Sequence, residues 1–91
     1  MKASTRSADH NAAFGQVLAD LRRGAGLSQE KLGFEADFDR SFISLLERGK
    51  RSPTLDTIMR LCQVLQVSLT QLSTLVEATL DGENDSRSNS R

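Results

Sequence analysis

Aromatic side chains, cysteine and histidine are scarce in this chain of 91 residues. It contains four phenylalanines but neither tryptophan nor tyrosine, so a core must be built mainly from leucine, isoleucine, valine and alanine. The single cysteine, Cys62, excludes an internal disulfide framework, and its apolar surroundings predict a buried small side chain rather than a redox thiol. Because His10 is the only histidine, no Cys/His cluster has metal-ligand spacing, and we expect no metal and no other cofactor.

The motifs of enzymes and of membrane proteins are missing as well. Gly24 and Gly26 follow a helical pattern rather than a strand, which argues against a phosphate-binding loop. Ser41 and Ser44 have no base close by in the sequence that could activate a hydroxyl. No apolar run has transmembrane length, and the N-terminus lacks the apolar segment of a signal peptide. The sequence therefore predicts a cytoplasmic protein that is not an enzyme and does not contact a membrane.

The formal net charge of the chain is zero, but its basic and acidic residues are unevenly distributed along the sequence. There are 12 basic and 12 acidic residues, unlike the strongly basic balance of many nucleic-acid binders. Between Arg40 and Arg60, however, basic residues exceed acidic ones by three. The Lys50–Arg51 pair in this segment fits a solvated turn as well as it fits an anion-binding loop.

Apolar residues at helical spacing, together with capping residues, predict an all-α chain. We expect five helices and no strand, with the approximate bounds Asn11–Arg23, Ser28–Ala36, Asp39–Arg48, Leu55–Leu65 and Ser68–Leu80. In the fourth helix one apolar face is expected to point inward, formed by Leu55, Ile58, Leu61, Cys62 and Leu65. Residues 1–10 and 81–91 are polar without periodicity, so we expect a disordered arm and a disordered tail around one domain, 11–80.

The stretch Leu27–Arg51 is the chemically directed part of the chain. Its two short helices are separated by a tight turn, which is the spacing of a helix-turn-helix. Ser28 and Asp39 are capping residues at the two helix starts, and Gly49 can end the second helix in a left-handed conformation. The outward face of the second helix carries Arg40, Ser41, Ser44 and Leu45.

The residues LSQEKLG and DRSFISLLERGKRSPTLDTI in this stretch resemble the helix-turn-helix of the Xre family, the Cro and phage-repressor type. The resemblance covers Phe14–Leu72, and the segments LGF and FDRSFIS look most like the controller proteins of restriction–modification systems. It implies a compact, lambda-repressor-like bundle of five helices, in which the helix Asp39–Arg48 enters the major groove of double-stranded DNA.

The resemblance also implies roles for individual residues. The base-reading residues would be Arg40, Ser41, Ser44 and Leu45, and the phosphate-binding residues would be Ser28, Gln29, Arg48, Lys50 and Arg51. A structural ion pair would join Arg22 to Glu47. Arg40 could instead contact phosphate or pair with Asp37 or Asp39, and Ser28 could act only as a cap. The chain departs from the family pattern in the turn, where Asp37 replaces glycine, and in the preceding helix, where Gly33 replaces alanine.

Members of this family dimerise, so that two reading helices meet a palindromic operator. The fifth helix has a broad apolar surface, and we expect its residues Leu75, Val76 and Leu80 to contact a second copy unless they all pack internally. The predicted function is therefore transcriptional regulation by a nucleoid-associated homodimer, with no small-molecule ligand evident. A module of antitoxin or co-activator type, which uses the same fold to bind a protein, is the alternative.

Overall fold

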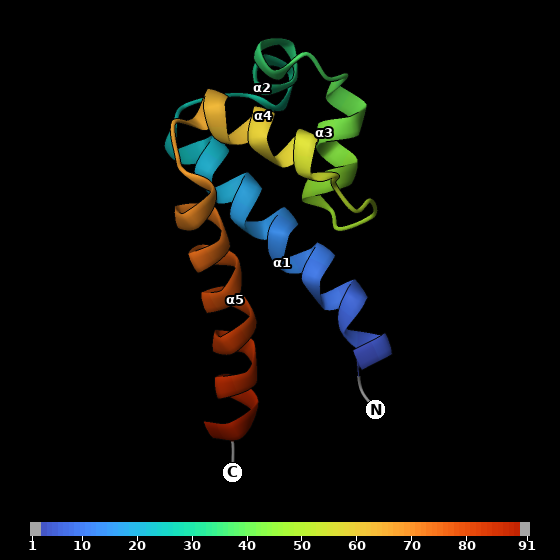
Figure 1. Cartoon of the computed structure of the whole chain (residues 1–91), viewed down its shortest axis with the longest axis vertical. Helices are drawn as coiled ribbons and strands as arrows, with labels where there is room; N and C mark the ends of the chain where they lie inside the picture. Colours follow the sequence, from blue (N-terminus) through green and yellow to red (C-terminus); the bar gives the residue numbers. More distant parts are fainter. Residues whose placement is uncertain (1–2, 90–91) are drawn as a thin grey trace.

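The computed structural model describes the backbone of residues 3–89 and the side chains of residues 10–82 (Figure 1). In this part of the chain every regular element is a helix: α1 (Ala3–Gly24), α2 (Gln29–Ala36), α3 (Arg40–Glu47), α4 (Leu55–Leu65) and α5 (Leu69–Asn89). The predicted all-α fold with five helices is therefore confirmed.

The starts of four helices are set by capping side chains, among them Ser28 and Asp39, which the sequence predicts as caps. Ser28, Asp39 and Thr54 each accept a hydrogen bond from a backbone N–H of the first turn, over 3.0, 2.9 and 3.1 Å respectively. At α5, Ser68 and Gln71 each accept a hydrogen bond from the backbone N–H of the other, over 3.0 and 2.8 Å respectively. These bonds satisfy backbone donors that have no partner inside the helix, so the helix boundaries are encoded locally.

Positive backbone angles mark the places where the chain turns. Gly49 has a φ of 72° directly after α3, as the sequence predicts, and Gly26 has a φ of 75° after α1. Two non-glycine residues share this left-handed region, Asp37 with a φ of 65° and Gln66 with a φ of 60°. Asp37 thus takes the conformation of the glycine that it replaces in the family pattern, which aspartate tolerates better than most residues.

The two outer helices run past their predicted bounds. α1 begins at Ala3, within the segment expected to be a disordered arm, and α5 continues to Asn89, through most of the expected tail. Neither extension has a periodic apolar face. An existing helix nevertheless lengthens without a new nucleation step, because each added residue forms one more hydrogen bond. Outside the described residues lie the ends of both segments, 1–2 and 90–91.

One apolar core joins the five helices. Its buried members come from every helix: Phe14, Val17, Leu18, Leu32, Ala36, Ile43, Leu46, Leu61, Cys62, Leu65 and Leu72. Burial raises the pKa of the Cys62 thiol, as expected of a small core side chain and not of a reactive one. The inward position predicted for Leu55 is wrong, since this side chain is 63% exposed. It is the first residue of α4, where the neighbouring helices do not cover the helix end.

The helices are arranged around α1, which packs against both α3 and α5. Beyond this contact α1 and α5 diverge toward their free ends, and α3 lies on the other side of α1 from α5 (Figure 1). A glycine permits the close approach of α1 to α3. A Cβ atom at Gly15 would lie 2.5 Å from the carbonyl oxygens of Leu46 and Glu47. The backbone of α1 therefore directly supports the C-terminal end of α3.

Candidate nucleic-acid interface

The outer face of α3 is polar and open, and its inner face is in the core. Ile43 and Leu46 are fully buried. Of the predicted base-reading residues, Arg40 and Ser41 are exposed, and Ser44 and Leu45 are half-buried one turn further along. The four side chains thus lie on the solvent side of a helix whose orientation is fixed by its buried residues.

The first turn of α3 is closed by Asp39. Its Oδ2 atom accepts hydrogen bonds from both the backbone N–H and the hydroxyl of Ser41. The hydroxyl bond, followed by the backbone bond, lowers the pKa of the Asp39 carboxyl. Because the Ser41 hydroxyl donates its hydrogen to Asp39, its oxygen can only accept a hydrogen bond from a further ligand. A donor group on a base edge could supply that bond.

The C-terminal end of α3 is held by a hydrogen-bonded ion pair. Arg22 of α1 donates from Nε and Nη2 to the two carboxylate oxygens of Glu47, over 2.6 and 3.1 Å. The same guanidinium donates from Nη1 to the carbonyl oxygen of Leu27 over 2.9 Å. The bond to Glu47 raises the pKa of Arg22. Both side chains are nearly buried, so this bidentate pair fixes α3 to its scaffold.

Gln29 extends this network to Arg40 at the N-terminal end of α3. Its Nε2 donates to Glu47 Oε1 over 2.9 Å, which turns its carbonyl oxygen toward Arg40, whose Nη1 donates to it over 3.4 Å. The side chain of Gln29 is therefore occupied within the protein. The Gln29 backbone N–H is in the first turn of α2, where an orphan donor at a positive helix end suits an anion.

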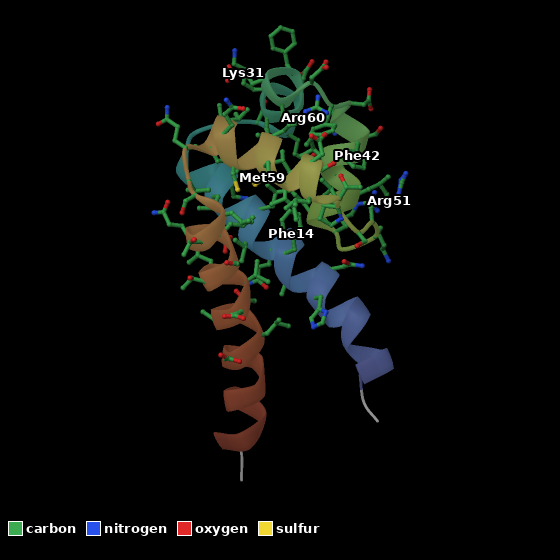
Figure 2. The ribbon with its side chains drawn as sticks, viewed as in Figure 1. Phe14, Lys31, Phe42, Arg51, Met59 and Arg60 are labelled. Atoms are coloured by element: carbon green, nitrogen blue, oxygen red, sulfur yellow. The ribbon has the colours of Figure 1, made fainter. Side chains whose placement is uncertain are left out.

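A basic loop follows α3 at the end opposite Arg40. Arg48, Lys50 and Arg51 are grouped in this loop, which continues through residues 52–54 into α4. Arg48 donates from Nε to the Ser44 hydroxyl over 3.3 Å, and the Arg51 guanidinium carbon lies 5.7 Å from the centre of the Phe42 ring (Figure 2). The predicted phosphate-binding cations of the loop thus lie beyond the C-terminal end of α3, while Gln29 at the start of α2 contacts both Glu47 and Arg40.

The turn between α2 and α3 makes contacts that the sequence does not predict. Asp37 pairs with Arg60 of α4 over 3.5 Å, and Arg40 contacts Gln29 rather than either neighbouring aspartate. Gly33 is required by the turn as it stands, because a Cβ atom there would lie 2.6 Å from the Phe38 carbonyl oxygen. From the sequence, this glycine is expected only to lower helix propensity, and Arg60 has no assigned role. No local signal in the sequence pairs Arg60 with a turn 23 residues away.

The predicted dimer residues lie apart from α3. Leu75 is 42% exposed, and Val76 and Leu80 are half-buried on α5. Since α1 lies between α5 and α3, contact with another chain through α5 leaves the outer face of α3 free (Figure 1). Among the side chains of residues 10–82, no three metal-ligating residues gather at a point where they could hold an ion. None of the helices in the described part of the chain is long and apolar enough to cross a membrane.

Comparisons with known protein sequences and solved structures identify relatives of this chain. An "Uncharacterized HTH-type transcriptional regulator y4dJ" from Sinorhizobium fredii is 42% identical over 65 residues, covering 71% of this chain and 84% of that protein. The restriction–modification controller protein C.AhdI from Aeromonas hydrophila is 41% identical, with a TM-score of 0.65 over 67% of this chain and 92% of that one. The controller C.Esp1396I, as a tetramer with its natural operator, is 26% identical, with a TM-score of 0.70 over 78% and 95% of the two chains.

A model of a helix-turn-helix family matches residues 18–72, which span the end of α1 through the buried Leu72 of α5. This range contains the two helices, the turn and the basic loop described above. The resemblance to control proteins is thus found both in sequence and in fold. The chain belongs to the Xre-type helix-turn-helix family of transcriptional regulators, and within it resembles the restriction–modification controller proteins.

Proposed function

We propose that this chain is a sequence-specific regulator that binds double-stranded DNA with α3 in the major groove. The observation that carries the proposal is the open polar face of α3, with Arg40 and Ser41 at its N-terminal end and a basic loop at its C-terminal end. The N-terminal residues of such a helix reach base edges, and cations beside it neutralise phosphates. Because its target is DNA, we place the protein in the cytoplasm, associated with the nucleoid, with no catalytic activity of its own.

Each end of α3 has a separate task in this proposal. Arg40 can give guanine two hydrogen bonds, while Ser44 can contact any base and Leu45 can meet a thymine methyl group. The contact with Gln29 holds the Arg40 side chain near the start of α2, where Ser28 and the Gln29 N–H face a phosphate. Arg48, Lys50 and Arg51 bind the backbone at the other end, which fixes the register of the helix without reading sequence.

Dimerisation through α5 completes the proposal. A single helix-turn-helix contacts too few base pairs for useful specificity, and two copies on a palindromic operator double the number. The exposed Leu75, with Val76 and Leu80 beside it, supplies an apolar contact surface within the domain 11–80. Binding of operator DNA by more than one copy is documented for the similar controller C.Esp1396I. Sedimentation at micromolar concentration should give a dimer, and Leu75→Glu should give a monomer. A monomeric parent chain would overturn this part of the proposal.

DNA binding is tested with sites selected from random DNA. The affinity of the parent chain, Arg40→Ala and Arg48→Ala is then measured for single-base variants of the selected site over a range of salt concentrations. Arg40→Ala should remove discrimination at one base in each half-site, worth about 1–3 kcal/mol. Arg48→Ala should leave base preference unchanged and reduce the slope of log K against log salt by about 0.9 for each phosphate that is no longer neutralised.

The matched control is Arg23→Ala, which removes the same charge from an exposed site on α1, where Arg23 pairs with Asp20 over 3.6 Å. This variant should change neither base preference nor, within error, the salt slope. If Arg40→Ala weakens binding to every sequence equally, Arg40 contacts phosphate and not a base. If the parent chain selects no site at all, sequence-specific binding is wrong.

A further inference from the structure

The N-terminal end of α3, which is the proposed base-reading end, is supported by a pair of tilted aromatic rings in addition to its cap. Phe38 lies in the turn before α3, and Phe42 lies in the first turn of α3 itself. Their ring centres are 5.2 Å apart with a tilt of 45°, a favourable aromatic arrangement. Both side chains are half-buried and pack against the core. The ring pair therefore couples the direction of the turn to the direction of α3.

Arg60 of α4 binds this turn from the other side. Its guanidinium carbon lies 4.5 Å from the centre of the Phe38 ring, within the range of a cation–π contact. Its Nη2 lies 3.5 Å from Asp37 Oδ2 and its Nη1 lies 3.6 Å from Asp56 Oδ2. Two carboxylates thus orient the guanidinium over the ring, and one of them belongs to the residue with the left-handed backbone. Figure 2 labels Arg60 on α4 and Phe42 on α3.

We propose that Arg60 is a positioning residue for DNA reading, which sets the direction of the N-terminal end of α3 through Phe38 and Phe42. The inference rests on the proposed function, because it assumes that this end of α3 contacts bases. α4 packs mainly on α2 and α5, and its residue Arg60 pairs with Asp37 and lies over the Phe38 ring in the turn that leads into α3. Displacement of this turn would move Arg40 and Ser41 relative to the bases. In the basic loop, Arg51 lies against the Phe42 ring, whereas Arg48 is held one turn further along by its hydrogen bond to Ser44.

The chemistry requires arginine at this position. A planar guanidinium can stack on a ring face and bond to two carboxylates at once, whereas a lysine ammonium keeps the charge but not the plane. Methionine fills similar space without either interaction. A contact of Arg60 with a phosphate is a different role for the same residue, and it can be recognised because it would contribute to the salt dependence of binding.

The test compares Arg60→Met, Arg60→Lys and the control Arg23→Met in the full chain. Arg23→Met makes the same exchange at an exposed arginine of α1, which pairs with Asp20 over 3.6 Å. Affinity is measured for the selected site and for random-sequence DNA at the same salt concentration, together with the salt slope and the melting temperature. Arg60→Met should weaken binding to the selected site about threefold to tenfold and leave binding to random DNA and the salt slope unchanged. Arg60→Lys should be intermediate, and the control should match the parent chain.

Each other outcome overturns the inference in a recognisable way. An equal decrease on both DNAs means that Arg60 supports only the fold, and a salt slope reduced by about 0.9 means a phosphate contact. Unchanged affinity for both DNAs means that Arg60 positions nothing. Arg60→Met can lower the melting temperature so far that its binding is not measurable. In that case Arg60→Lys decides, through the ratio of its affinity for the selected site to its affinity for random-sequence DNA. A parent chain that does not distinguish its selected site from random DNA removes the proposed function itself, and this inference with it.

Discussion

The two ends of α3 are fixed by different kinds of contact. At the C-terminal end, the side chains of Arg22 and Glu47 are only 11% and 6% exposed, and the backbone of α1 approaches at Gly15. At the N-terminal end, Arg40 and Ser41 are exposed, and support comes from a cap and stacked rings. One short helix thus has an end that stabilises the domain and an end that is free to meet a ligand.

The difference between the two ends of α3 follows from the hydration of their charged groups. A nearly buried guanidinium or carboxylate loses hydration, so its removal or exposure changes the folding free energy strongly. An exposed arginine keeps its hydration, and its contacts add little to stability. Substitutions at the Glu47 end should therefore act on folding, and substitutions at the Arg40 end should act on DNA binding with little effect on folding.

The largest expected effect is that of Glu47→Ala. It leaves the Arg22 guanidinium without its carboxylate and Gln29 without its acceptor, in a nearly buried site. We expect the free energy of unfolding to fall by about 3 kcal/mol, the order found when one partner of a buried pair is removed. Urea unfolding followed by circular dichroism measures the change.

The control for this variant is the double substitution Arg22→Met, Glu47→Leu, which removes both charges and retains apolar volume. It should recover most of the decrease in stability, since no unpaired charge stays in the site. Stability of Glu47→Ala within about 0.5 kcal/mol of the parent chain, as for an ordinary surface substitution, would mean that the two ends of α3 do not differ in this way.

The local features of this fold were predictable from the sequence. Caps at Ser28, Asp39 and Ser68 depend on residues within one turn of each other, and the apolar spacing around Leu18 or Leu61 shows which face is buried. The outward position of Arg40 followed from the same periodicity. These features share one property: the interacting groups are close in the chain, so residue types and spacing are sufficient to identify them.

The contacts that orient α3 depend on distant residues, and spacing could not reveal them. Gly15 has no local turn to explain it, and its role appears only where α1 crosses the end of α3. The link from Arg60 to Phe38 likewise requires the folded positions of two helices. The resemblance to a known family supplied the Arg22–Glu47 pair, which composition and periodicity alone do not indicate. The helical extensions of α1 and α5 were missed because their sequences are polar and have no apolar period.

A smaller effect on stability, which depends on pH, is expected from Asp39 at the exposed N-terminal end of α3. The Asp39 carboxyl has a lowered pKa because the Ser41 hydroxyl and backbone N–H bond to its charged form. A lowered folded-state pKa contributes stability above the unfolded value, about 3.9, and this contribution disappears as pH falls through the folded-state pKa. Asp39→Asn retains a capping acceptor without charge. Its melting temperature should therefore lie slightly below that of the parent chain at neutral pH.

This difference should close as pH falls below the ordinary range of an aspartate, because the parent carboxyl then becomes protonated and neutral like the amide. Ser28→Asn is the matched control, since it exchanges one uncharged cap for another at the start of α2, and its offset from the parent chain should be independent of pH. Melting curves from pH 7 to the acid limit of reversible unfolding measure both offsets. An Asp39→Asn offset that stays constant with pH would show that the Asp39 charge adds nothing to the cap. The cap at the N-terminal end of α3 would then act only as a neutral hydrogen-bond acceptor.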